Sequence, residues 1–239
     1  MKLDEIKKLH QKKYRQQFGH FLVEGEHLVL ELQKAAQRDA RLRSSKVYVT
    51  AEREQWRTPF ELHVISNRHM DAIVETENPQ GIVAVVPMVA PLSTPANEQN
   101  IYLHEAQDPG NLGTILRTLA WFGNFRCLLS PGSVDPYNSK VLRASMGAIF
   151  HVPIEVDVPL ATLQNRFDRL ACLDMQGESL SVADFKKFSC YVFGNEARGL
   201  PHAVMEEFRM KRFTIPGSGA IESLNLASSV NMCAYEIRR

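Results

Sequence analysis

With 239 residues, the chain is long enough for one large domain or two ordinary ones. A hydrophobic share of 44% and a charged share of 23% are typical of a soluble globular protein. No apolar run approaches the roughly 18 residues that a membrane-spanning helix needs, and residues 1–8 are not typical of a signal peptide. The net charge of +1 does not by itself indicate a nucleic-acid partner.

The cysteines and histidines give no sign of a metal site. The four cysteines are scattered, and three of them lie in apolar surroundings: Cys127, Cys172, Cys190 and Cys233. This pattern predicts reduced, buried thiols in a cytoplasmic protein. The eight histidines are also dispersed, without pairing to carboxylates or cysteines at helical spacing, so we expect no bound metal.

Basic residues are concentrated near the start of the chain. Residues 1–15 hold six lysines and arginines against two acidic residues, and residues 34–57 hold seven against three. Such clusters can neutralise phosphates, which makes five side chains of the first cluster candidates for RNA binding: Lys7, Lys8, Lys12, Lys13 and Arg15. The alternative is a helix face that is merely solvated.

The first 90 residues alternate between short apolar runs and one clear helical pattern. Strands are predicted at residues 21–23, 46–49, 62–65 and 82–86, and apolar residues at helical spacing follow Gly25. This alternation predicts a small α/β layer structure. The proline-rich stretch that follows predicts a linker, which we place at residues 91–98.

Residues 99–239 alternate more regularly. Apolar strands are predicted at residues 101–104, 126–130, 152–156, 169–173, 189–193 and 211–215. Helices are predicted between them, among others at 113–122, 138–146 and 199–208, and an amphipathic helix is predicted at the C-terminus. The pattern is typical of a parallel sheet with crossover helices. The glycine-dense turns follow the last strands rather than the first, which argues against an ordinary Rossmann enzyme.

Three segments carry the motifs of this second domain. They are residues 111–117 (Asn-Leu-Gly-Thr-Ile-Leu-Arg), 193–200 (Phe-Gly-Asn-Glu-Ala-Arg-Gly-Leu) and 215–225 (Ile-Pro-Gly-Ser-Gly-Ala-Ile-Glu-Ser-Leu-Asn). They resemble the three motifs of the SpoU (TrmH-type) branch of the SPOUT RNA methyltransferases. In addition, residues 12–25 resemble the start of the substrate-binding domain of SpoU proteins, which is similar to a ribosomal-protein L30e-type fold.

The resemblance implies an architecture that periodicity cannot show. Residues 99–239 would form a trefoil-knotted methyltransferase domain with a parallel sheet, and residues 1–90 a smaller L30e-like α/β domain that binds RNA. The knotted loops of the family wrap the methyl donor S-adenosylmethionine. Family members are homodimers, and the apolar last helix is a candidate contact between two copies.

Polar residues of the motifs are candidates for catalysis: Arg117, Asn111, Glu196, Ser223 and Asn225. Asn111 is expected to cap a helix that starts near Gly113. In the family the residue matching Arg117 is assigned to the acceptor 2′-hydroxyl, although a guanidinium does not readily lose a proton. We therefore favour a role in binding phosphate and stabilising the developing alkoxide, and general-base catalysis stays open. Glu196 is expected either to orient Arg117 or to bind the acceptor ribose.

A second set of residues is expected to hold the donor: Gly194, Ile215, Leu224, Ser218 and Met175. Gly194 follows an apolar strand, so its lack of a side chain would let the donor approach the backbone. Ile215 and Leu224 would enclose the adenine ring. Met175 lies in the loop 173–177, which is a weaker candidate for a wall of the pocket.

The sequence thus predicts an S-adenosylmethionine-dependent 2′-O-ribose methyltransferase for structured RNA, most readily 23S ribosomal RNA. Two alternatives share the fold: a transfer-RNA 2′-O-methyltransferase, and a non-catalytic RNA-binding or ribosome-assembly relative. A third is an ordinary ligand-binding α/β domain in which the motifs are only caps and turns. The presence of all five candidate catalytic residues disfavours an inactive relative.

Overall fold

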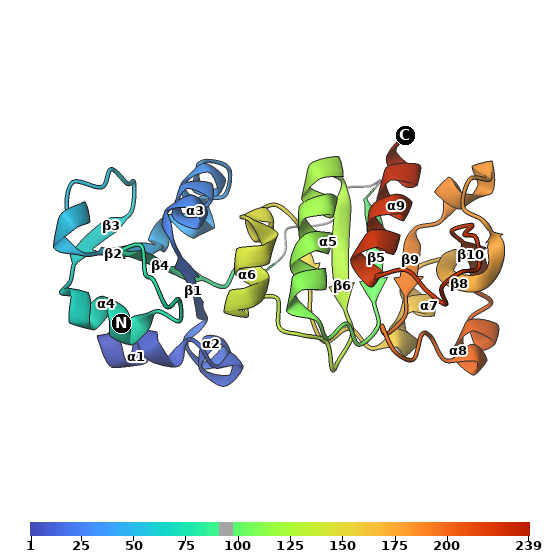
Figure 1. Ribbon diagram of the computed structural model, residues 1–239, viewed down its shortest axis with the longest axis horizontal. Helices are drawn as coiled ribbons and strands as arrows, with labels where there is room; N and C mark the ends of the chain where they lie inside the picture. The colour runs from blue at the N-terminus through green and yellow to red at the C-terminus, as the bar shows by residue number, and fades with distance from the viewer. Residues whose placement is uncertain (91–97) are drawn as a thin grey trace. The chain divides into compact units, whose positions relative to one another are not determined.

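Two separate β-sheets organise the chain in the computed structural model, which describes residues 1–90 and 98–239 (Figure 1). The predicted linker at 91–98 therefore lies outside the described residues except for its last position. The first compact unit consists of residues 1–90 together with Asp135–His151, and the remainder forms the second unit. The sequence predicted two continuous domains, whereas residues 135–151 pack with the first unit although they follow the second unit's first strands.

The sheet of the first unit has four strands in the order β1-β4-β2-β3. They are β1 (His20–Glu24), β2 (Lys46–Val49), β3 (Glu61–Val64) and β4 (Ile82–Pro87). All four strands were predicted. β4 pairs antiparallel with both β1 and β2, and β2 pairs parallel with β3. Residues 82–86 are all buried because β4 is a central strand of this sheet.

Helices cover this sheet. The predicted helix after Gly25 is α3 (Glu26–Arg38), and the predicted helix at 138–146 is α6 (Ser139–Ser145). Three short helices were not predicted: α1 (Leu3–Lys8), α2 (Lys12–Phe18) and α4 (Asn67–Ile73). Single 3-10 turns complete the unit at η1 (Ala40–Ser44), η2 (Ala51–Arg53) and η3 (Ala148–Phe150). Ile6 and Met70 anchor α1 and α4 in one apolar cluster with residues of β1, β2 and β4.

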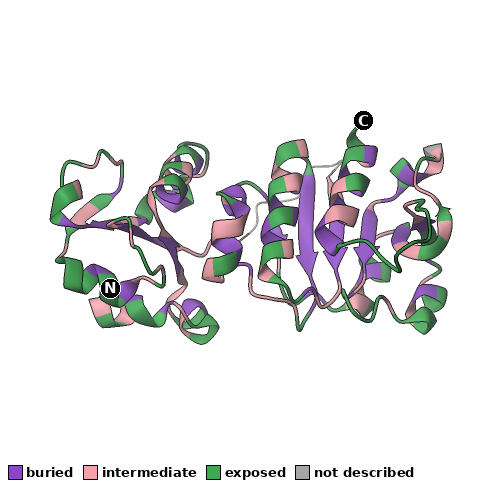
Figure 2. Cartoon of the chain, viewed as in Figure 1, coloured by how far each residue is buried: buried purple, intermediate pink, exposed green. Residues whose placement is uncertain are grey.

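The sheet of the second unit is parallel throughout and has the order β10-β8-β9-β5-β6-β7. Its strands are β5 (Gln99–Leu103), β6 (Phe125–Leu129), β7 (Ile154–Glu155), β8 (Leu170–Ser179), β9 (Cys190–Phe193) and β10 (Lys211–Thr214). All six coincide with predicted strands. Figure 2 shows that the strands at the centre of this sheet are buried, as near-continuous apolar runs require.

Helices lie on both sides of the second sheet. α5 (Pro109–Phe122) and α9 (Leu226–Arg238) pack against each other and lie side by side in Figure 1. α7 (Leu163–Arg166) and α8 (His202–Glu207) contribute Leu163 and Met205 to a different apolar cluster, which includes Tyr102. Two 3-10 turns, η4 (Leu160–Thr162) and η5 (Ala183–Lys187), complete this unit. None of the helices in the described parts of the chain is long and apolar enough to cross a membrane.

The pairing of β10 with β8 is irregular and explains why β8 is longer than predicted. Arg212 is the register partner of Cys172, but the next residue, Phe213, is the partner of Glu178. The segment 173–177, predicted as a loop, thus belongs to strand β8 but bulges away from the register with β10. Gly177 permits this arrangement because a Cβ atom there would lie closer than 3.0 Å to the backbone of Phe213.

Candidate active site

The three motifs meet at the carboxyl ends of parallel strands. The first follows β5, the second follows β9, and the third follows β10. β5 and β9 are neighbours, whereas β8 separates β9 from β10. Because all these strands point the same way, the loops that follow them lie along one edge of the sheet, where open α/β sheets bind ligands.

The first motif lies in helix α5, which begins one turn earlier than predicted. α5 starts at Pro109, and its N-cap is Asp108, whose Oδ1 accepts a hydrogen bond of 2.6 Å from the backbone N–H of Asn111. The prediction that Asn111 caps the helix is therefore wrong. Asp108 satisfies the helix end, so the amide side chain of Asn111 can bind other groups.

Asn111 links the second and third motifs by hydrogen bonds. Its Nδ2 donates to Glu196 Oε1 at 3.4 Å, and its Oδ1 accepts from Asn225 Nδ2 at 2.8 Å. The bond to Glu196 is long, whereas the bond to Asn225 has ordinary length. The chain Glu196–Asn111–Asn225 thus brings together three predicted catalytic residues that lie up to 114 positions apart in the sequence.

The direction of these hydrogen bonds follows from a helix cap. Asn225 is the N-cap of α9, and its Oδ1 accepts from the backbone N–H of Ser228 at 3.2 Å. Its Nδ2 must then face Asn111 as a donor, so Asn111 presents Oδ1 to Asn225 and Nδ2 to Glu196. A carboxylate accepts hydrogen bonds, which fits the Nδ2 donor of Asn111. The backbone of α9 therefore orients the whole chain of side chains.

Arg117 and Ser223 stand apart from this hydrogen-bonded chain. Arg117 is exposed on α5, and Ser223 is exposed in the segment before α9. Within residues 1–90 and 98–239, neither side chain has a hydrogen-bond or ion-pair partner. The structure does not show the expected pairing of Glu196 with Arg117, since Glu196 binds Asn111 instead. The Arg117 guanidinium is therefore available to an incoming group.

The second motif is held by its own backbone and by the loop after β5. Asn195 is buried and exchanges two backbone hydrogen bonds with Gly199. A Cβ atom at Gly194 would lie closer than 3.0 Å to the backbone of Gly199 and Leu200. The glycine is thus required by the turn that follows it, which is a different reason from the predicted approach of a donor.

Glu105 is a site residue that the sequence analysis missed. Its backbone N–H donates to Ser130 Oγ at 2.7 Å, and its carbonyl accepts from Asn195 Nδ2 at 2.9 Å. Its Oε2 accepts from Arg198 Nη2 at 2.5 Å. Glu105 also has a φ of +50°, which is uncommon for a residue with a side chain. These contacts fasten the loop after β5 to the second motif, and only its place directly behind a strand could have indicated this role.

His104 is a second residue without a predicted role. Its ring Nδ1 is buried and has no hydrogen-bond partner in the described chain. Burial lowers the pKa of His104, more than the nearby Glu105 carboxylate raises it. The ring is therefore neutral at pH 7 and offers one donor and one acceptor nitrogen.

The residues expected to hold the donor leave apolar surface uncovered beside the motifs. The exposed fractions are 66% for Met175 and 42% for Leu224, and Ile221, which was not predicted, is 68% exposed. Ile215 is half-buried, and Ser218 Oγ makes only a local hydrogen bond of 3.4 Å from the N–H of Ala220. Large exposed apolar side chains in the bulged part of β8 and in the segment after β10 are typical of a ligand-binding surface. They suit a ligand with a flat, partly apolar ring such as adenine.

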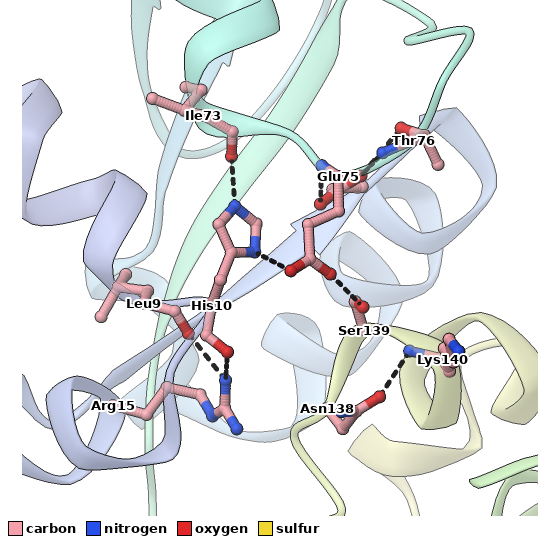
Figure 3. Close-up of polar contacts among 10 residues, drawn as sticks. Leu9, His10, Arg15, Ile73, Glu75, Thr76, Asn138, Ser139 and Lys140 are labelled. Atoms are coloured by element: carbon pink, nitrogen blue, oxygen red, sulfur yellow. Dashed lines mark hydrogen bonds and ion pairs between the residues drawn. The ribbon is translucent and has the colours of Figure 1, made fainter.

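The candidate RNA-binding residues divide into two kinds. The four lysines, Lys7, Lys8, Lys12 and Lys13, are exposed on α1 and α2. Arg15 is only 4% exposed, and its guanidinium binds Asp135. It also donates to the backbone carbonyls of Leu9 and His10 (Figure 3). The prediction that Arg15 contacts RNA is contradicted by this burial. Its charge is neutralised within the protein, where its role is structural.

No group of three or more His, Cys, Asp or Glu side chains in the described chain is arranged to hold a metal ion. The four cysteines are all buried, as predicted. Burial raises the pKa of Cys127 and of Cys172 to about 12. These thiols are therefore protonated and unsuited to nucleophilic or ligand roles.

The second unit is thus a parallel α/β domain whose three motifs lie together at the carboxyl edge of its sheet. Comparisons with known proteins identify the family. Residues 98–235 match the sequence model of the SpoU rRNA Methylase family, and residues 1–84 match that of the MRM3-like substrate binding domain. The chain belongs to the SpoU rRNA methylase family, as the three motifs predicted, and is a methyltransferase.

Similar proteins span the whole chain. It is 33% identical to the 23S rRNA (guanosine(2553)-2'-O)-methyltransferase RlmP of Bacillus subtilis, over 99% of this chain and 96% of that protein. It is 32% identical to an uncharacterized tRNA/rRNA methyltransferase of Synechocystis, over 98% and 89% of the two chains. The crystal structure of an AdoMet-bound rRNA methyltransferase from Sinorhizobium meliloti superposes with a TM-score of 0.82 at 25% identity, over 99% and 93%. Methyltransferases of this family use S-adenosylmethionine.

Proposed function

We propose that the protein methylates the 2′-oxygen of a ribose in 23S ribosomal RNA, with S-adenosylmethionine as the methyl donor. The observation that carries this proposal is the hydrogen-bonded chain Glu196–Asn111–Asn225, which joins all three motifs at one sheet edge. Likeness to RlmP of Bacillus subtilis over nearly the full length of both proteins supports ribosomal RNA. Transfer RNA is the alternative substrate, because the Synechocystis relative is described only as a tRNA/rRNA methyltransferase.

The acceptor side of the site binds and orients the ribose. When bound, S-adenosylmethionine supplies an electrophilic methyl group with a neutral thioether as its leaving group, so the protein contributes alignment and charge stabilisation. Glu196 Oε1 is held by Asn111, while its Oε2 has no hydrogen-bond partner in the described residues and can accept from a ribose hydroxyl. The Arg117 guanidinium cannot readily accept a proton, but it can bind a phosphate and stabilise negative charge on the 2′-oxygen. Ser223 is available as a further hydrogen-bond donor to the acceptor.

The donor side is formed by the bulged part of β8 and by the segments after β9 and β10. Met175, Ile215 and Leu224 would cover the adenine ring, which accounts for apolar side chains left exposed at this edge. Backbone groups next to Gly194 and the hydroxyl of Ser218 would bind the polar parts of the donor. The first unit would hold the RNA through Lys7, Lys8, Lys12 and Lys13.

A homodimer through α5 and α9 is part of the proposal. Trp121 on α5 is 85% exposed, and Met232 and Tyr235 on α9 are 44% and 55% exposed. The ring of Phe122 packs against that of Tyr235 with centroids 6.2 Å apart, which joins the two helices near these side chains. Exposed aromatic and methionine side chains on two adjoining helices are typical of a protein interface.

We infer further that the C-terminal segment is knotted and that the first unit is L30e-like. Support for the knot is the path of the chain, which leaves the edge strand β10 and returns as α9 to pack on α5, across the position of β8 and β9. Support for the second inference is the match of residues 1–84 to a substrate binding domain. A cytoplasmic location agrees with four buried thiols and with ribosomal RNA as the substrate.

Transfer of labelled methyl groups to defined RNAs tests the function. The protein should methylate 23S rRNA, and mapping of 2′-O-methyl sites in RNA from cells with and without the gene should reveal the nucleotide. Arg117→Ala should reduce transfer about 100-fold or more while binding of S-adenosylmethionine, measured by isothermal titration calorimetry, persists. The transfer rate of Arg117→Lys should lie between those of the wild type and Arg117→Ala, because lysine keeps the charge but not the planar guanidinium. Near wild-type transfer by Arg117→Ala would contradict the role of Arg117. Failure of the wild-type protein to bind S-adenosylmethionine would contradict the proposed enzymatic function.

A further inference from the structure

The corner between α1 and α2 presents an aromatic ring among lysines. Tyr14 is half-buried on α2, and the Nζ atoms of Lys8 and Lys13 lie 5.5 and 5.6 Å from the centroid of its ring. Phe18, one turn further, is nearly parallel to Tyr14 at an angle of 16° and a centroid distance of 6.1 Å. The acidic residues of α1 lie in its first turn, away from this corner. Positive charge and an aromatic face are therefore combined at one place.

Buried interactions hold this corner in a fixed conformation. Arg15 Nη1 donates to the carbonyls of Leu9 and His10 at 2.8 and 2.7 Å, where α1 ends and α2 has not yet begun. The opposite side of the guanidinium binds Asp135 Oδ2 through Nε at 3.1 Å and Nη2 at 2.5 Å. Figure 3 shows the two bonds from Arg15 to the carbonyls of Leu9 and His10, and the hydrogen bond of His10 Nε2 with the carbonyl of Ile73, 3.0 Å long. The neighbouring Tyr14 thus sits on a preorganised support.

We propose that Tyr14, flanked by Lys8 and Lys13, is a stacking site for an unpaired nucleobase of the RNA substrate. The inference rests on the proposed function and specifies the kind of RNA that the first unit recognises. Proteins recognise unpaired nucleotides by stacking bases on aromatic rings and by placing cations near the flanking phosphates. Double-helical RNA keeps its bases inside the helix, so it offers no ring face to Tyr14. A protein partner would not require the two lysines, Lys8 and Lys13, that lie over the ring.

The lysines do not block the stacking face. A lysine ammonium lies at the end of a flexible stem, so Lys8 and Lys13 can leave the ring and move to phosphates when a base arrives. The rigid part of the site is the helix corner, because buried Arg15 fixes its backbone. We therefore assign base stacking to Tyr14, phosphate binding to the lysines, and support of the site to Arg15.

Binding of single-stranded and duplex RNA to the full-length protein tests this site. The probes are a fluorescein-labelled 15-nucleotide oligo(A) and a duplex of the same length, followed by fluorescence anisotropy. Tyr14→Leu should weaken binding of oligo(A) about tenfold and leave duplex binding within about twofold. Tyr14→Phe is the matched control and should bind like the wild type, because it keeps the ring. Lys8→Ala and Lys13→Ala should each reduce the dependence of binding on salt concentration by about one phosphate contact.

The outcomes separate this proposal from the proposed function. If Tyr14→Leu binds oligo(A) like the wild type while both proteins methylate RNA, the proposed stacking site is wrong and the proposed methyltransferase function is upheld. If the wild type neither binds nor methylates RNA, both fail. A measurement on the wild-type protein keeps the proposal testable even if the Tyr14→Leu variant does not fold. Photocrosslinking of the wild-type protein to RNA that contains 4-thiouridine should label Tyr14. Labelling confined to other residues would overturn the proposal.

Discussion

At the scale of single residues, two glycines are explained by neighbouring backbone. A Cβ atom on Gly194 would collide with Gly199 and Leu200, and a Cβ atom on Gly177 would collide with Phe213. Neither glycine has a positive φ, so space rather than conformational freedom requires them. The two close approaches shape the second motif and the bulge of β8, and therefore two sides of the proposed donor site.

Gly194→Ala should lower the free energy of unfolding by about 2 kcal/mol or more, because the turn 195–200 must move to admit the methyl group. Gly217→Ala is the matched control. It lies in the third motif, but nothing occupies the space around its missing Cβ atom, so the change should stay within about 0.5 kcal/mol. Urea denaturation followed by circular dichroism measures both values. Equal stability of the two variants would contradict the packing explanation.

The same residues show what the sequence could and could not predict. The motifs placed Asn111, Glu196 and Asn225 in one site, and the structure joins them. The predicted role of Arg15 failed because it depends on a partner that is distant in sequence: Arg15 meets Asp135 across 120 positions. A basic residue within a basic cluster gives no sign that it is buried.

At the scale of elements, strands were easier to predict than short helices. Most strands in the described residues coincide with apolar runs in the sequence, whereas α1, α2 and α4 have only six or seven residues and show too few turns for a periodic pattern. α8 begins at His202, later than the predicted start at 199, because Pro201 occupies its N-cap. The bulge in β8 depends on its pairing with β10, which no local pattern contains.

Asn225 has two functions that one substitution can separate. Its Oδ1 caps α9, and its Nδ2 donates to Asn111. Asn225→Asp should keep the cap, because aspartate is an equally good N-cap, but it cannot donate to Asn111. We expect its free energy of unfolding to stay near that of the wild type while methyl transfer falls at least tenfold. Asn225→Ala should lose transfer and also about 1 kcal/mol of stability. Full activity of Asn225→Asp would show that transfer does not need the bond to Asn111.

At the scale of the whole molecule, buried thiols and phenols make the fold sensitive to alkali. Burial raises the pKa of Cys127 from its ordinary value of 9.0 to about 12, and it also raises the pKa values of Tyr102 and Tyr191. The folded state therefore holds these protons more tightly than the unfolded state. The stabilisation is fully present below pH 9 and is lost as the pH rises towards the folded pKa values.

The free energy of unfolding should therefore fall steeply between pH 9 and pH 12. Each buried thiol contributes a slope of up to about 1.4 kcal/mol per pH unit in this range. Cys127→Ala should make the slope shallower by about that amount, whatever its effect on stability at pH 7. Urea denaturation at a series of pH values measures the slope. An unchanged slope would mean that Cys127 ionises without cost in the folded protein.

The exposed surface of α5 and α9 leads to a prediction about assembly. Trp121 leaves 85% of its surface exposed, and burial of such a side chain between two copies would stabilise a dimer by the hydrophobic effect. Trp121→Glu should therefore give a monomer, because a dimer would have to bury the new charge. Val64→Glu is the matched control: Val64 is also exposed, at 54%, but lies on β3 in the first unit, so this variant should remain dimeric. Light scattering coupled to size-exclusion chromatography measures the mass at several concentrations. A monomeric wild type, or a dimeric Trp121→Glu variant, would place the interface elsewhere or exclude it.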